Sequence, residues 1–196
     1  HPGGDRRPAD RGHSGAERPG SGRGCRLRRR QGPRAGLGHV AARGEHRPGR
    51  HRPDRRYDVT AESWAFFGYR LETTSVAGDW IGLSEITAIG TDRLALIERD
   101  KLNGPAARIK RVYTVDVPSG TPAAGTLPVL TKQLAVDVLP ALRATNGWTQ
   151  EKLEGLTVAG NGDVYAVTDN DGVSDATGET VLLNLGSAKT VFKARR

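Results

Sequence analysis

Apolar and polar residues alternate along the C-terminal part of the chain in a pattern that predicts paired β-strands. Residues 153–159 and 164–168 are apolar-rich stretches joined by an Asn-Gly pair, which is typical of a tight hairpin turn. The same plan occurs 70 residues earlier, so that Leu94 falls on Val164. A small β-unit repeated at such a period predicts consecutive blades of a β-propeller, with function in the loops at one end of the channel.

Each repeat unit is predicted to hold four strands. The strands are expected over residues 83–89, 94–98, 109–117 and 133–138 in the first unit, and over 153–159, 164–168, 180–185 and 190–193 in the second. An aromatic hairpin over 57–69 is interpreted as the end of an earlier blade, and a short helix is expected over 139–146. A closed propeller has roughly 4–8 blades. We therefore predict an all-β fold, a partial β-propeller of about two to three four-stranded blades, and expect it to be the C-terminal piece of a larger domain.

The first 55 residues differ in composition from residues 56–196. Up to residue 56 the chain holds 16 Arg, 12 Gly and all five His, with a net charge of +11, whereas the rest carries −3. With almost no aromatic or β-branched side chains, this Arg/Gly/Pro-rich segment is expected to be disordered. Three interpretations stay open: a basic arm that binds nucleic acid or another anionic surface, a solvated linker, and a stretch read out of frame, because its residues are those of GC-rich codons.

Several classes of site are excluded by composition. Every His lies before residue 56, so residues 56–196 cannot supply a Ser-His-Asp triad. Cys25 is the only cysteine, and no phosphate-binding or dinucleotide-binding glycine motif occurs after residue 56. The acidic balance of that part gives no reason to expect nucleic acid as its partner. The sequence contains no run of 18 apolar residues, so no membrane span is predicted. No signal peptide is visible.

An acidic segment follows the second strand of the second unit. Asp169, Asn170, Asp171 and Asp175 lie within seven residues. Carboxylate and amide oxygens are the ligands that calcium prefers, although the spacing is not that of an EF-hand loop. A turn held by Asp and Asn side chains is the alternative. The segment therefore predicts either a calcium site or an ordinary turn.

Charged residues also occur at corresponding places of the first unit. Glu98, Arg99 and Asp100 are expected in a loop equivalent to the acidic segment, where they could orient an anion or form a surface ion pair. Glu85 and Glu154 begin their units and are expected at matching positions of two blades. Both are expected to face the crowded channel, where a carboxylate needs a metal, a cation or hydrogen bonds.

The motifs of residues 56–190 resemble those of the phytase-like family, described by its esterase-like activity. The segments that carry the resemblance are 78–86, 95–100, 108–110, 146–148, 153–156 and 167–172. The resemblance implies a β-propeller, exported to the periplasm or secreted by bacteria, that hydrolyses phosphoesters or esters of small molecules. It does not extend to residues 1–55.

Our leading hypothesis is a metal-assisted hydrolase in which Ca²⁺ neutralises the substrate and polarises water. The catalytic candidates are Glu85, Glu154 and Arg99, and the metal-ligand candidates are Asp169, Asp171, Asp100 and Glu98. The alternative is a non-catalytic propeller that binds a partner or small ligand. A third hypothesis gives the Arg-rich arm an RNA-binding role.

Overall fold

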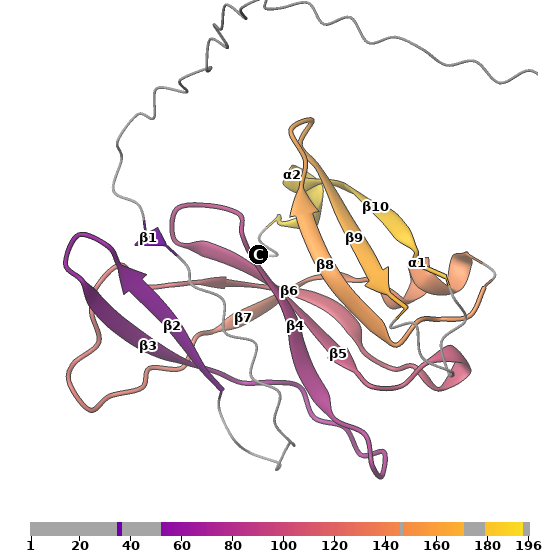
Figure 1. Ribbon diagram of the computed structural model, residues 1–196, viewed down its shortest axis with the longest axis horizontal. Helices are drawn as coiled ribbons and strands as arrows, with labels where there is room; N and C mark the ends of the chain where they lie inside the picture. The colour runs from indigo at the N-terminus through magenta and orange to yellow at the C-terminus, as the bar shows by residue number, and fades with distance from the viewer. Residues whose placement is uncertain (1–34, 37–51, 146, 171–178, 194–196) are drawn as a thin grey trace, which may run out of the picture. The chain divides into compact units, whose positions relative to one another are not determined.

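A computed structural model describes residues 35–36, 52–145, 147–170 and 179–193, all of which belong to one compact unit, 33–196. These residues are mostly β and form three antiparallel sheets (Figure 1). Sheet A contains β1 (Ala35–Gly36), β2 (Arg52–Asp58) and β3 (Ser63–Tyr69), in that order. The predicted aromatic hairpin is therefore confirmed, with β2 beginning at Arg52. The predicted disorder of residues 1–55 stays a prediction, because most of that segment lies outside the described residues.

Sheet B is a four-stranded antiparallel meander. Its strands are β4 (Ile81–Ala88), β5 (Arg93–Asp100), β6 (Lys110–Asp116) and β7 (Lys132–Asp137), in sequence order. A 3-10 turn, η1 (Gly104–Ala106), lies between β5 and β6, and helix α1 (Leu139–Ala144) follows β7. The four strands and the helix of the first predicted unit are thus confirmed.

Sheet C contains β8 (Lys152–Val158), β9 (Asp163–Asp169) and β10 (Leu182–Ser187), with β9 in the middle. The strand predicted over 190–193 is wrong, because helix α2 (Ala188–Val191) covers the first two of these positions and the other two lie in no strand. The reason is packing: the helical turn brings both Val191 and Phe192 into the core, whereas a strand would direct successive side chains to opposite faces. No helix in the described part of the chain is long and apolar enough to cross a membrane.

The 70-residue repeat is visible in the strand register. The pairing of β4 with β5 shifts between Leu83 and Glu85, and the pairing of β8 with β9 shifts between Leu153 and Gly155. Both bulges lie at the same place in the repeat. Glu154 therefore corresponds to Ser84 and not to Glu85, which corrects the expectation that the two glutamates occupy matching positions.

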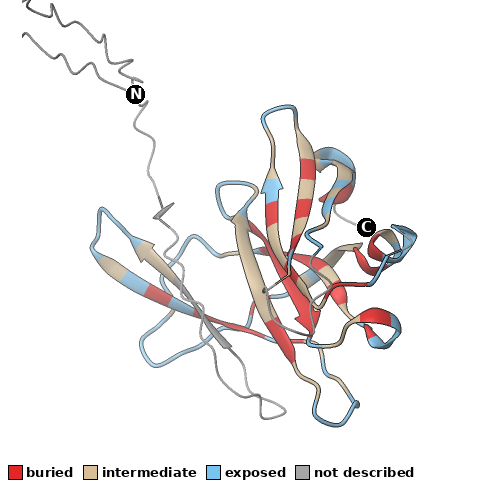
Figure 2. Ribbon diagram, turned by 45° about the vertical axis from the view of Figure 1, so that its right-hand side comes forward, coloured by how far each residue is buried: buried red, intermediate tan, exposed pale blue. Residues whose placement is uncertain are grey.

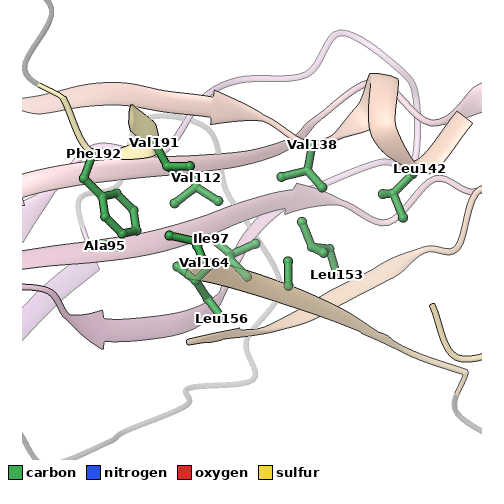
Figure 3. Close-up of a cluster of buried hydrophobic side chains, with 11 residues drawn as sticks. Ala95, Ile97, Val112, Val138, Leu142, Leu153, Leu156, Val164, Val191 and Phe192 are labelled. Atoms are coloured by element: carbon green, nitrogen blue, oxygen red, sulfur yellow. The ribbon is translucent and has the colours of Figure 1, made fainter. Parts of the chain in front are cut away.

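Two apolar cores separate the three sheets. Between sheets A and B the buried side chains include Phe67, Leu94 and Leu96. Between sheets B and C they include Ile97 and Leu156, and Figure 3 shows these side chains directed toward one another. Successive residues of β5 thus enter different cores, so buried residues lie on both faces of sheet B. Figure 2 marks the buried residues along the strands in red.

Candidate functional site

The last three residues of β5 are all charged, and all three take part in ion pairs. Glu98, Arg99 and Asp100 are buried, with 0%, 6% and 0% of their surface exposed. They were expected in a loop, but they end a strand that is paired on both sides. Because side chains alternate along a strand, Glu98 lies on the side of sheet A and Arg99 on the side of sheet C. Each of the three has a partner of opposite charge.

Arg99 joins sheet B to the start of sheet C. Its Nη2 donates to Glu154 Oε1 at 2.8 Å, and its Nη1 donates to Glu151 Oε1 at 3.2 Å. Its guanidinium carbon also lies 5.2 Å from the centre of the Trp80 ring. A guanidinium over an aromatic face and between two carboxylates is held in a fixed orientation. The structure thus brings together two of the three catalytic candidates.

Local backbone features place these side chains. Glu154 is the bulge residue of β8, so the irregular register directs it toward Arg99. Gly82 lies beneath Trp80, where an added Cβ would be 2.5 Å from Cζ3 of the indole. Asp79 accepts a hydrogen bond from the Thr74 hydroxyl at 2.7 Å, which fixes the loop that carries Trp80. The cluster is therefore built by a bulge, a glycine and a hydrogen-bonded loop.

The Arg99 cluster contains one unsatisfied donor. The Arg99 side chain is 7% exposed, and its Nε has no hydrogen-bond partner among the described residues. Buried donors without an acceptor are uncommon in folded proteins, so each needs an explanation. The two carboxylates remain more accessible, since the side chains of Glu151 and Glu154 are 27% and 35% exposed. Water can therefore reach the carboxylates more easily than the guanidinium.

Glu98 lies in a different cluster, on the side of sheet A. It accepts hydrogen bonds from the Tyr69 hydroxyl at 2.6 Å and from Lys132 Nζ at 2.5 Å. Lys132 Nζ also lies 3.0 Å from Glu72, which accepts a hydrogen bond from the Tyr113 hydroxyl. Burial raises the pKa of Tyr113 to about 12, and the bond to Glu72 acts in the same direction. Burial alone would raise the pKa of Glu72, but Lys132 and Tyr113 lower it overall.

Asp100 forms a fully buried ion pair with Lys110. One carboxylate oxygen is in close contact with Lys110 Nζ, and the other accepts the backbone N–H groups of Arg108 (2.6 Å) and Ile109 (2.9 Å). Lys110 also donates to the carbonyl of Leu102 at 2.9 Å. Burial lowers the pKa of Lys110, and Asp100 opposes this effect. The pair holds the connection between β5 and β6 and leaves neither charge without a partner.

The remaining candidates lie apart from these clusters. Glu85 accepts hydrogen bonds from the backbone N–H of Ile86 at 3.0 Å and from the Thr87 hydroxyl at 3.3 Å. Asp169 is exposed at the end of β9, across from Lys152 in β8. Asp171 lies outside the described residues. The proposed roles of these three side chains stay predictions.

The predicted metal ligands Glu98 and Asp100 are each paired with a lysine. Within them, no group of three or more His, Cys, Asp and Glu side chains is arranged to hold a metal ion. Calcium needs several oxygen ligands, but Glu98 and Asp100 each face a lysine and Glu154 faces Arg99. Calcium at the acidic segment stays a prediction, because residues 171–178 are outside the described ranges.

Sequence reasoning missed the residues that complete these clusters. Trp80 and Glu151 complete the Arg99 cluster, and Lys110 and Lys132 neutralise the two buried carboxylates. Glu151 is three residues before Glu154, a spacing that could have indicated two carboxylates for one arginine. The lysines gave no such signal, because strand lysines are most often exposed.

One of three comparisons with known proteins gives a match. The family model described as "Phytase-like: Esterase-like activity of phytase" matches residues 40–172, which is more than half of the chain. This match begins before residue 56, where the sequence resemblance was expected to begin. Searches of curated proteins and of solved structures give no match.

Proposed function

The chain belongs to the phytase-like family, and we propose that it hydrolyses esters of small molecules at the cluster formed by Arg99, Glu151, Glu154 and Trp80. The observation that carries this proposal is the Arg99 guanidinium, which is held by Glu151 and Glu154 and lies over the Trp80 ring. A fixed donor of this kind is suited to an oxygen on which negative charge develops during reaction.

Glu154 is the proposed general base of the reaction. It contacts Arg99 at 2.8 Å, and its side chain is 35% exposed, so water has access to it. In the proposed step Glu154 takes a proton from water, and the oxygen of that water forms a bond to the ester carbonyl carbon. The carbonyl electron pair moves to the oxygen that Arg99 stabilises. When this pair returns, the bond to the alkoxide breaks, and the proton passes from Glu154 to the leaving alcohol.

The charge of the cluster favours an uncharged substrate. One guanidinium faces two carboxylates, so the three side chains carry a net charge of −1. A phosphate group would meet this negative charge, whereas a neutral carboxylic ester would not. Hydrolysis of phosphoesters therefore requires a further cation, and the predicted calcium at Asp169 and Asp171 is the proposed source. The ester reaction is proposed without it.

Glu85 is retained as a second candidate carboxylate. It lies in β4 just after the bulge, and the neighbouring Ser84 hydroxyl donates to the Leu153 carbonyl in β8 at 2.6 Å. The strand that carries Glu85 is thus joined to the strand that carries Glu154. We propose a positioning role for Glu85, which makes Glu85→Gln milder than Glu154→Gln.

The test is the rate of aryl acetate hydrolysis by the full chain and by Glu154→Gln. Loss of a general base lowers kcat by about 10²–10⁴-fold. Glu62→Gln is the matched control, because the same chemical change falls on an exposed turn between β2 and β3. Equal rates for Glu154→Gln and the control would contradict the proposed role. Ligand-dependent stabilisation without turnover would instead support a non-catalytic binding module.

We also propose the setting in which this activity takes place. The three sheets are interpreted as consecutive blades of a β-propeller, which is supported by the four-stranded meander of sheet B and the repeated bulge. Family membership supports action outside the cytoplasm, in the periplasm or after secretion, on a small-molecule substrate. RNA binding by the Arg-rich segment stays a separate prediction, tested by the salt dependence of binding.

A further inference from the structure

Strand β4 is bonded to both of the strands that carry the Arg99–Glu154 pair. It is paired with β5, where Gly82 lies opposite Arg99. It is also bonded to β8, because the Ser84 hydroxyl donates to the Leu153 carbonyl at 2.6 Å. Gly82 and Ser84 are two residues apart, so one short piece of strand links the place of the guanidinium to the place of the carboxylate.

Ser84 is the extra residue in the irregular pairing of β4 with β5. The register passes from Leu83 to Glu85 across consecutive residues of β5, which leaves Ser84 without a Cα partner there. An extra residue of this kind disturbs the ladder locally and can direct its side chain away from its usual course. Here the hydroxyl bonds to the neighbouring sheet and not to its own, since its acceptor lies in β8.

The acceptor of this bond is joined directly to the proposed general base. The carbonyl group of Leu153 lies in one plane with the nitrogen and Cα of Glu154, because the peptide bond does not rotate freely. A hydroxyl that holds the carbonyl oxygen therefore restrains the whole peptide group. This restraint matters because Glu154 is the bulge residue of β8, so the ladder holds it less firmly than its neighbours.

The residues on both sides of Glu154 are held by packing. The Leu153 side chain is 0% exposed and belongs to the core between sheets B and C. At Gly155, an added Cβ would lie 2.4 Å from Cγ1 of Val167, so glycine allows β8 to approach β9 this closely. The bond from Ser84 adds a restraint on the backbone between these two residues. The carboxylate thus extends from a fixed backbone, although the Glu154 side chain is 35% exposed.

We propose that Ser84 is a positioning residue, which directs the Glu154 carboxylate toward Arg99 by holding the peptide group between Leu153 and Glu154. The inference rests on the ester hydrolysis proposed above, in which Glu154 takes the proton from water. Without the hydroxyl this peptide group can turn, and the 2.8 Å contact between Glu154 Oε1 and Arg99 Nη2 is weakened. Displacement of a catalytic group by about 1 Å can lower the rate about 10²-fold.

The first test is a double-mutant cycle in urea unfolding, which needs no substrate. The coupling between Arg99 and Glu154 is obtained from Arg99→Met, Glu154→Gln and the double variant. The cycle is measured once in the wild-type chain and once with Ser84→Ala, so a general loss of stability in Ser84→Ala cancels. We expect Ser84→Ala to remove most of the coupling. Ser84→Thr, which keeps a hydroxyl, should preserve it.

Thr87→Val is the matched control for the cycle. The Thr87 hydroxyl donates to the Leu156 carbonyl at 3.0 Å, so this change also removes a bond from β4 to a carbonyl of β8. Leu156 is two residues beyond Glu154, and its carbonyl is not part of a peptide group of Glu154. The coupling should therefore keep its wild-type value in Thr87→Val. Equal losses in Ser84→Ala and Thr87→Val would overturn the proposal, because the effect would then be a general loosening of the two strands.

The second test is the hydrolysis of an aryl acetate by the wild-type chain, Ser84→Ala and Ser84→Thr. We expect Ser84→Ala to lower kcat by about 10–10²-fold with KM nearly unchanged, because the base is displaced while substrate binding is kept. Ser84→Thr should keep most of the wild-type kcat.

The two tests separate this inference from the proposed function. If the wild-type chain does not hydrolyse the ester, the proposed function fails, and the unfolding cycles alone decide whether Ser84 directs Glu154 toward Arg99. If the wild-type chain is active and Ser84→Ala keeps both its kcat and its coupling, the role of Ser84 is overturned while the proposed function stands.

Discussion

The buried pair of Asp100 and Lys110 makes a quantitative prediction about stability. Both side chains are 0% exposed, so removing the negative charge leaves an ammonium group in the core without its partner. Loss of one member of a buried ion pair costs about 3–5 kcal/mol of unfolding free energy. Asp100→Asn is the suitable change, because its amide oxygen can still accept the N–H groups of Arg108 and Ile109. We expect Asp100→Asn to destabilise the chain by that amount.

The assay is urea unfolding at neutral pH, followed by tryptophan fluorescence. The double variant Asp100→Asn, Lys110→Met should recover most of the loss, since a buried pair replaced by apolar groups is often neutral. The pH dependence gives a second check. Burial lowers the pKa of Lys110 in the folded chain below its usual 10.5. At a pH between this lowered pKa and 10.5, the unfolded chain therefore binds more protons than the folded chain. The contribution of Lys110 to stability therefore rises with pH through this window.

Without Asp100, the pKa of Lys110 falls further and this window widens. The difference in stability between the wild-type chain and Asp100→Asn should therefore become smaller as the pH rises toward 10.5. In the background of Lys110→Met the Asp100→Asn change should show no such narrowing. If Asp100→Asn lost less than about 1 kcal/mol of unfolding free energy at neutral pH, the reasoning would be refuted, because such a small loss is typical of exposed ion pairs. A stability difference between the two proteins that does not change with pH would refute it as well.

Three further predictions concern other parts of the structure. Burial raises the pKa of Tyr113 from 10.0 to about 12, so between these pH values the folded chain keeps a proton that the unfolded chain releases. The free energy of unfolding should therefore fall from pH 10 toward 12, and it should fall less in Tyr113→Phe. An equal fall in the wild-type chain and in Tyr113→Phe would contradict the shift. Ile97→Ala removes a fully buried side chain between sheets B and C and should cost about 2–5 kcal/mol in urea unfolding; a cost near zero would show that this core is not packed. Gly82→Ala adds a Cβ that would lie 2.5 Å from Cζ3 of Trp80, so it should displace the indole from Arg99 and lower ester hydrolysis; unchanged kinetics and tryptophan emission would argue against this contact.

Much of the fold could be predicted because it depends on local patterns. The Asn-Gly turn is present, with Gly162 at a φ of +86° and its N–H bonded to the Ala159 carbonyl at 2.9 Å. The 70-residue repeat predicted the strand pairs of sheets B and C. The fourth strand of the second unit was predicted by analogy alone. It failed because Val191 and Phe192 both pack into the core from a helical turn.

The site was harder to predict because its contacts join distant parts of the chain. Arg99 and Glu154 are 55 residues apart and meet only because sheets B and C pack together. A one-residue bulge directs Glu154 toward Arg99, and a bulge gives no clear signal in a single sequence. Lys110 and Lys132 looked like surface residues. Their burial becomes clear only once sheet B is seen to be covered on both faces.

The central claim is that Arg99 stabilises negative charge during ester hydrolysis that needs no metal. The most direct test is kcat for an aryl acetate, measured with a metal chelator present, in the full chain and in Arg99→Lys. A lysine keeps the positive charge but cannot reproduce the fixed guanidinium donors. We predict that the wild-type chain stays active with the chelator and that Arg99→Lys loses about 10²–10³-fold in kcat. Complete loss of wild-type activity with the chelator, or equal kcat for the two proteins, would contradict the account.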